Sequence, residues 1–264
     1  MQKPNHDRLK VTFLGTGTSI GVPVITCDCP VCVSTDERDK RMRTSVMIEV
    51  KGLTFVIDCG PDFRQQMLRE RVTNLDAVLF THEHRDHIAG LDDVRAFNYV
   101  LNKKIDIYGT PRVMEAIRIE FPYIFSETRY FGAPQLTMHP IDHQPFTIMG
   151  IEFIPIQVLH EKLSFTGFRV GDFPYITDAS FISEEELEKI KGSRVIVLNA
   201  LRNSKHVSHF SVNEAVEVLT KLAPEAAFLT HLSHFVGLHE EVNKKLPGVI
   251  QLAYDGLVVE IPES

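Results

Sequence analysis

Short apolar runs recur along the whole chain, separated by turn residues, and they predict β-strands in both halves. The first run, 9–14, alternates apolar and polar positions and ends at Gly15. The second and third are joined by Lys51-Gly52, a sequence typical of a hairpin. We expect strands at 9–14, 45–50, 53–58, 76–80, 104–109, 146–148, 151–154, 156–160, 164–170, 173–178, 194–199, 226–230, 250–254 and 257–261.

Longer segments with apolar residues every three to four positions predict helices between these strands. They lie at 63–71, 88–101, 111–119, 183–190 and 211–222. Residues 121–140 are rich in aromatic residues and proline, and we expect an irregular segment there, either a lid or a packed connection. The last two strands are expected to pair with each other across a turn at Asp255-Gly256.

Composition narrows the class of protein. The chain has 264 residues, 44% of them hydrophobic, and no repeat or linker divides it, so we expect one domain over 1–264. The net charge of −7 argues against nucleic acid as a partner. No apolar run is long enough to cross a membrane and no secretory leader is visible, so we expect a cytoplasmic protein without a membrane partner.

The densest candidate chemistry is the segment His82-Glu83-His84-Arg85-Asp86-His87, which follows the apolar run 77–80. A strand that ends in a loop frees its last side chains from alternation, so they can converge on one point. Imidazole and carboxylate groups together are the ligands of zinc, manganese or iron. The alternative is a histidine cluster on the surface without a metal.

Four other polar residues also directly follow apolar runs. A single histidine or aspartate in such a place is usually a polar residue leaving the core. Five strand ends of this kind in one chain instead suggest ligands gathered at one edge of the sheets. The four residues are Asp58, His160, Asp178 and His231.

A second cluster is Cys27-Asp28-Cys29-Pro30-Val31-Cys32. Three thiolates this close can occupy one face of a tetrahedral zinc ion, but a fourth ligand must come from elsewhere in the chain. In a reducing compartment the cysteines are otherwise free thiols, which is the alternative interpretation.

At this point the sequence resembles the metallo-β-lactamase superfamily. The resemblance rests on His-x-His-x-Asp-His at 82–87, Asp58 in Asp-x-Gly, and the strand-end residues above. It implies an α/β fold with four layers, the αββα sandwich. It also implies two divalent metal ions, zinc or manganese or else iron. One ion would be held by His82, His84 and His160, the other by Asp86, His87 and His231, with Asp178 bridging them and Asp58 orienting the histidine loop.

The opening segment 14–19 and the cysteine cluster resemble one branch of that superfamily, the phosphoribosyl 1,2-cyclic phosphate phosphodiesterases of the carbon–phosphorus lyase pathway. In this branch three cysteines and a histidine bind a structural zinc, which here implies Cys27, Cys29, Cys32 and His234. The motif around His209 resembles that of a catalytic histidine, so Asp86 and His209 are the catalytic candidates, with His206 as a rival to His209. Homodimerisation is implied by the resemblance alone.

The function implied is hydrolysis of a small, cyclic phosphodiester by a hydroxide bound to two metal ions. One alternative is a nuclease that processes the 3′ end of tRNA. Bacterial nucleases of that kind usually carry a long arm between the residues matching His160 and Asp178, and no arm fits in this interval. The other alternative is a metal-binding accessory protein without catalytic activity, against which the intact ligand set and His209 argue.

Overall fold

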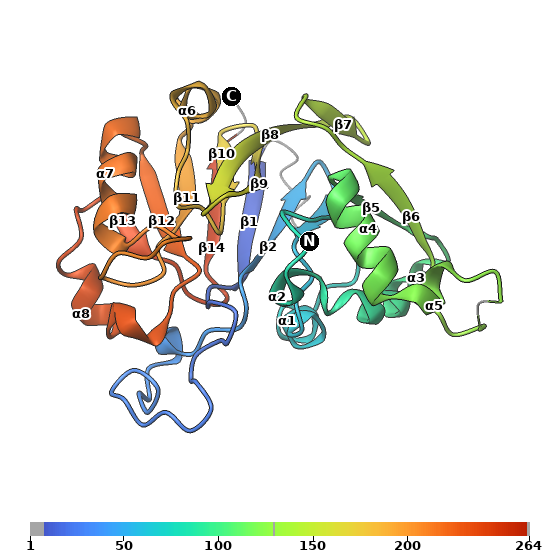
Figure 1. Ribbon diagram of the computed structural model, residues 1–264, viewed down its shortest axis with the longest axis horizontal. Helices are drawn as coiled ribbons and strands as arrows, with labels where there is room; N and C mark the ends of the chain where they lie inside the picture. The colour runs from blue at the N-terminus through green and yellow to red at the C-terminus, as the bar shows by residue number, and fades with distance from the viewer. Residues whose placement is uncertain (1–7, 129, 263–264) are drawn as a thin grey trace, which may run out of the picture.

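The computed structural model describes residues 8–128 and 130–262. In this part of the chain, two β-sheets pack face to face, and helices cover the outer faces of the pair (Figure 1). This is the αββα sandwich that the resemblance implies, so the expected fold class is confirmed. No helix among the described residues is both long enough and apolar enough to span a bilayer.

The first sheet has seven strands, of which β3 to β6 run parallel to one another. Their spatial order is β14 (Val258–Pro262), β1 (Arg8–Gly15), β2 (Ser45–Val50), β3 (Leu53–Ile57), β4 (Ala77–Leu79), β5 (Ile105–Gly109) and β6 (Leu136–Pro140).

The second sheet also has seven strands, with β10 to β13 parallel. Their spatial order is β13 (Ile250–Leu252), β12 (Ala226–Thr230), β11 (Val195–Asn199), β10 (Phe173–Ile176), β9 (Leu163–Val170), β8 (Ile151–His160) and β7 (Phe146–Ile148).

Helices from the two halves of the chain form the two outer layers (Figure 1). The first half contributes α1 (Phe63–Arg69), α2 (Arg85–Ile88), α3 (Arg95–Leu101), α4 (Pro111–Glu120) and α5 (Pro122–Phe125), and the second half α6 (Glu184–Ile190), α7 (Val212–Leu222) and α8 (His239–Asn243). Short 3₁₀ helices are η1 (Glu37–Asp39), η2 (Leu91–Val94) and η3 (His234–Val236).

Apolar side chains fill the space between the sheets. Phe55 and Phe153 meet edge to face with their ring centroids 5.2 Å apart, and Phe13 contacts Phe228 at 5.6 Å. All but Phe228 are fully buried, so each ring pair adds orientation-dependent attraction to the burial of a large apolar area. This core holds the two sheets in one relative position, and therefore fixes how their strand ends meet.

The expected elements differ from the observed ones in the middle of the chain. The helix expected at 88–101 is divided into α2, η2 and α3, because the backbone N–H of Gly90 donates to the carbonyl of Cys59 at 2.8 Å instead of to a carbonyl one helical turn earlier. The segment 121–140 is not irregular throughout, since it contains α5 and the edge strand β6. The strands expected at 151–154 and 156–160 form one strand that continues through Pro155.

The expectation for the end of the chain was wrong. β13 and β14 do not pair with each other: β13 lies parallel to β12 in the second sheet, whereas β14 lies antiparallel to β1 in the first. The turn at Asp255-Gly256 therefore carries the chain from one sheet to the other. Local hydrophobic pattern is the same in either arrangement, so it could not distinguish them.

Candidate metal centre

Three of the strand-end residues adopt a backbone conformation that is rare outside glycine. The φ angles are +67° for Asp58, +55° for Asp178 and +55° for His231. Residues of this kind are found where the surrounding structure over-determines them, often at functional sites. Each follows a strand whose neighbour in the sheet is parallel. His87 lies beside both Asp58 and Asp178, and His231 lies beside Asp178, so the three positions share one edge of the sandwich.

The histidine loop is held by the buried carboxylate of Asp58. The backbone N–H of Thr81 donates to its Oδ1 at 2.9 Å, and the Thr81 hydroxyl donates to Oδ2 at 2.8 Å. Nδ1 of His87 lies 2.7 Å from the same Oδ2. A carboxylate on one ring nitrogen fixes the tautomer and directs the other nitrogen, Nε2, towards the sheet edge.

The predicted ligands converge at this edge. Three groups of residues each offer ligand atoms within 4.8 Å of one another: His82, His87 and Asp178; Asp86, His87 and His231; and His160, Asp178 and His209. Nε2 of His82 and Nε2 of His87 are buried and have no hydrogen-bond partner. Buried nitrogen atoms without a partner are costly, so their presence beside carboxylates fits a divalent metal ion.

His84 is not in any of these groups, but its ring adjoins the rest. Its centroid lies 4.6 Å from that of His82 and 5.3 Å from that of His160. Phe165 stacks on His82 with centroids 4.0 Å apart and lies 4.8 Å from His160. The structure therefore brings all seven residues predicted for the dinuclear centre to one place. They surround the ring of Phe165, which sequence reasoning did not identify.

Electrostatics at this edge favours the metal-binding forms of two of these residues, the ionised carboxylate of Asp178 and the neutral imidazole of His82, whereas Asp86 and Asp58 hold the pKa of His87 well above its usual range despite its burial. Burial opposes ionisation of Asp178, but His231 and His87 hold the pKa of Asp178 well below its usual range. Burial also holds the pKa of His82 well below that of a free histidine. Both shifts therefore favour forms that can bind a cation without first losing a proton.

Threonines form a supporting layer that the sequence analysis missed. Thr81 lies 2.9 Å from Nδ1 of His82, Thr177 donates to Asp178 at 2.6 Å, and Thr18 lies 3.2 Å from Nε2 of His231. The available signal was the recurring dipeptide in which threonine directly precedes a candidate ligand. It identifies Thr81 and Thr177 but not Thr18, since the hydroxyl of Thr230 in Thr230-His231 contacts Thr44 instead.

His209 lies beside these residues, just before α7. Its Nε2 is 3.0 Å from Oδ1 of Asp178, and its ring stacks near His231 with centroids 4.9 Å apart. His206, the rival candidate, is farther from the centre and contacts His209 rather than Asp178. Of the two histidines, His209 is therefore the one that adjoins the candidate ligands.

The cysteine cluster lies in the long connection between β1 and β2, drawn in blue in Figure 1. Nδ1 of His234 is 3.3, 3.4 and 3.5 Å from the sulfur atoms of Cys27, Cys29 and Cys32. The backbone N–H of Cys32 lowers the pKa of the Cys29 thiol to about 6, which favours a thiolate. Three sulfurs around one imidazole are a donor set that fits tetrahedral zinc.

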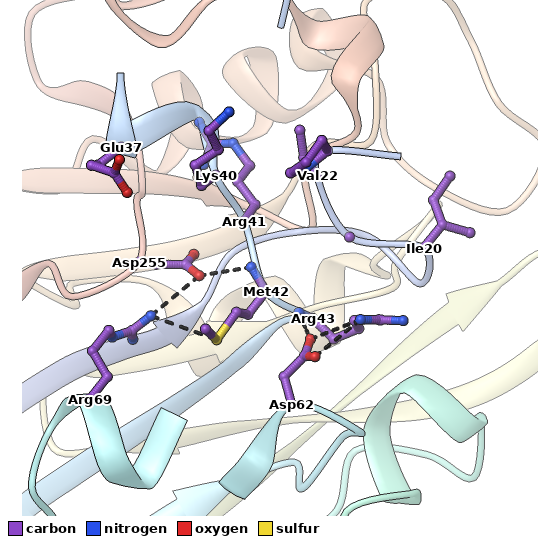
Figure 2. A pocket seen from close by; sticks show the side chains of 12 residues that line it. Ile20, Val22, Glu37, Lys40, Arg41, Met42, Arg43, Asp62, Arg69 and Asp255 are labelled. Atoms are coloured by element: carbon purple, nitrogen blue, oxygen red, sulfur yellow. Dashed lines mark hydrogen bonds and ion pairs between the residues drawn. The ribbon is translucent and has the colours of Figure 1, made fainter. Parts of the chain in front are cut away.

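A polar cavity of about 470 Å³ adjoins the same connection (Figure 2). Its charged groups are largely paired, since Arg43 binds Asp62, and Asp255 accepts hydrogen bonds from the backbone N–H of Met42 and from Arg69. Backbone hydrogen bonds also join segments that are distant in sequence: the N–H of Gly17 donates to the carbonyl of Met42, and the N–H of Thr18 donates to the carbonyl of Leu232. This network attaches the connection to α1, to the turn before β14 and, through Thr18, to His231.

Comparison with known proteins agrees with this architecture. The chain is 40% identical to a diphosphatase of the PhnP family of known crystal structure, with a TM-score of 0.91 over 96% of this chain and 97% of that one. It is 38% identical over 259 residues to an octanoyltransferase of Porphyromonas gingivalis, covering 97% of this chain but only 52% of that protein. A ribonuclease Z of Methanopyrus kandleri is 25% identical over 96% of this chain and 98% of its own length.

The chain thus spans about half the length of the octanoyltransferase, so the activity in that name is not assigned to the shared half. The model of the β-lactamase superfamily domain matches residues 54–232, which include every residue predicted for the dinuclear centre. The chain therefore belongs to the β-lactamase superfamily of metal-dependent hydrolases, and its αββα sandwich is the metallo-β-lactamase fold.

Proposed function

We propose that this chain, as one domain over residues 1–264, hydrolyses small phosphodiesters with the help of two divalent metal ions. The observation that carries the proposal is the convergence of imidazoles and carboxylates from both sheets at one edge, with His209 beside them. The similarity to a diphosphatase of the PhnP family supports phosphorus as the atom attacked.

The ligands would be those predicted from the sequence. The residues His82, His84 and His160 would hold one ion, and Asp86, His87 and His231 the other, with Asp178 between them. Bound there, zinc, manganese or iron would supply positive charge for the phosphoryl oxygens and an acidic water. Cys27, Cys29, Cys32 and His234 would hold a separate, structural zinc.

The residues of the chain itself then have distinct tasks. Asp58 keeps the His87 ring in one orientation, and Thr177 does the same for the carboxylate of Asp178. His209 is the proton donor: as the bond between phosphorus and the leaving oxygen breaks, its Nε2 gives that oxygen a proton. Phe165 covers His82 and His160 and excludes water from their far side.

A cyclic ester such as phosphoribosyl 1,2-cyclic phosphate is the substrate we propose first, and a diphosphate ester is the second to test. Both present a phosphoryl group with a leaving oxygen to the same residues. A tRNA-processing nuclease is less well supported despite the similarity to ribonuclease Z. β8 and β9 form a tight hairpin in which His160 pairs with Leu163, and β10 follows directly, so no arm projects there.

The experiment is a measurement of metal content together with hydrolysis of bis(4-nitrophenyl) phosphate. We expect about three metal ions per chain in the wild type. Asp178→Ala should lose metal and nearly all activity, with kcat/KM at least about a thousandfold lower. His209→Ala should keep its metal and lose about a hundredfold in kcat on a diester with an alkoxide leaving group, which needs the proton, and much less on the nitrophenyl ester. Metal binding without hydrolysis of any diester or diphosphate would instead favour a non-catalytic accessory protein.

A further inference from the structure

The hydroxyl of Ser208 lies between two imidazoles beside the centre. Its Oγ is 2.9 Å from Nδ1 of His209 and 3.1 Å from Nδ1 of His206. Ser208 is buried, with 7% of its surface exposed. A buried hydroxyl between two imidazoles is constrained. It can donate to a ring nitrogen only if that nitrogen carries no hydrogen, and it can accept only from one that does.

The backbone determines the direction of these hydrogen bonds. The N–H of Ser208 points at Nδ1 of His206 at 3.4 Å, so that nitrogen is an acceptor and carries no proton. The Ser208 hydroxyl has one hydrogen, which it can give to His206 or to His209. When His209 carries a proton on both ring nitrogens, as a proton donor must, its Nδ1 donates to the Ser208 oxygen and the hydroxyl donates to His206. In that form the chain of bonds runs from His209 through Ser208 to His206.

The main chain around His209 is already fixed. The N–H of Phe210 donates to the carbonyl of Ala179 at 2.7 Å, and the N–H of Leu201 donates to the carbonyl of Phe210 at 2.9 Å. Ser211 then begins α7 with a capping box that it forms with Glu214. The main chain does not fix the ring of His209, which is held instead by Asp178 at Nε2 and by Ser208 and His206 at Nδ1.

We propose that Ser208 and His206 are positioning residues for His209: they hold its Nδ1–H so that Nε2 faces the leaving oxygen of the substrate. The inference rests on the proposed function, because it assigns a purpose to the orientation of His209. A ring turned by half a rotation would present carbon instead of nitrogen to the substrate. Ser208 and His206 themselves lie on the far side of His209 from Asp178 and touch no reacting atom.

The test compares two diesters that differ in their leaving group, 4-nitrophenolate and an alkoxide. The alkoxide needs a proton to leave, whereas 4-nitrophenolate does not. Ser208→Ala should lower kcat for the alkyl ester by about tenfold or more, leave KM within about twofold, and change the nitrophenyl reaction by less than about threefold. Ser208→Thr, which keeps the hydroxyl, should recover most of the loss.

His206 offers a matched pair. His206→Asn places an oxygen near the position of Nδ1 and should retain activity on the alkyl ester, whereas His206→Ala should behave like Ser208→Ala. An equal loss on both esters, or a Ser208→Thr variant as poor as Ser208→Ala, would show that these residues serve only the stability of the loop and would overturn the inference.

A second readout does not depend on turnover. In ¹⁵N spectra of the metal-loaded protein, the two ring nitrogens of His209 should show distinct shifts, and these should become averaged in Ser208→Ala. Hydrolysis that is unaffected by Ser208→Ala, with an unchanged His209 spectrum, would refute the inference while leaving the proposed function intact. No hydrolysis of any diester, with the two distinct shifts still present, would refute the function but not the hydrogen-bonded orientation.

Discussion

The two candidate metal centres of this chain are built in opposite ways. The candidate dinuclear centre consists of imidazole and carboxylate groups delivered by strand ends of both sheets, and the core between the sheets holds them in place. The cysteine cluster uses soft ligands on a long connection that contains only isolated bridges and one short 3₁₀ helix, η1. One centre is organised by the fold before any ion arrives; in the other, an ion would organise the chain.

This difference separates function from stability. Asp178 and His231 have a strained backbone with positive φ, and this strain is tolerated because the paired strands before them hold the chain in place. The cysteine cluster has little apolar packing of its own to hold it, because Cys32 is buried only in a small cluster with Val22 and Val31. We therefore expect loss of the cysteine centre to change stability first, and loss of support at the strand ends to change metal affinity first.

The largest effect should come from Cys29→Ser. Removing one sulfur should release about one metal ion per chain and lower the melting temperature by about 10 °C, because binding to the folded state contributes several kcal/mol. The measurements are metal content and thermal unfolding. Asp28→Ser is the matched control: it lies between the cysteines with its side chain exposed, and should change neither. An unchanged metal content in Cys29→Ser would contradict a structural zinc.

Acid should weaken the region that holds the cysteine connection. Burial and the nearby Arg41 lower the pKa of His239 to about 4, and the backbone N–H of His239 binds Asp39 of η1. The folded state thus binds this proton less well than the unfolded state does. His239 therefore contributes stability above pH 6.5 that is lost as the pH falls towards 4, on the order of 2–3 kcal/mol.

The measurement is the free energy of unfolding of wild type and of His239→Gln between pH 7 and 4. Because the other histidines titrate in both proteins, the difference between the two isolates His239. That difference should shrink as the pH falls. A constant difference across this range would show that His239 does not titrate in the window.

A smaller effect on affinity is expected at the strand ends. Asp58→Asn keeps an acceptor for Thr81 and tolerates a positive φ, but it removes the negative charge beside His87. Metal affinity, measured by competition with a chelator, should fall by about 10- to 100-fold. Asp76→Asn is the control, a buried carboxylate at the opposite end of β4 that binds Thr54 and Lys103. It should lower stability and leave metal affinity unchanged.

Much of the fold could be predicted because strand and helix periods are local properties. The alternation in 9–14 and the apolar run before His82 each correspond to an observed strand. What failed was information that lies far away in the chain. Gly90 interrupts a helix because its N–H bonds the carbonyl of Cys59, and residues 258–262 pair with β1 of the first sheet rather than with β13 of the second.

The candidate site, like the fold, could be predicted from the sequence only in part. Ligand types and strand-end positions are visible in the sequence, and the structure brings those residues together, although their assignment to particular metals stays a prediction. Thr18, Phe165 and Ser208 were not found, because a hydroxyl or a ring becomes informative only when its neighbour in space is known. Their sequence surroundings are those of ordinary core or loop residues.

The separation of β13 from β14 affects how this protein is made on the ribosome. Arg8 of β1 and its partner Glu260 of β14 are 252 residues apart, so the strand that completes the first sheet is the last to be synthesised. Until then β1 has an unpaired edge, which can pair with another chain. Folding of the first sheet therefore cannot be completed until β14 has been synthesised.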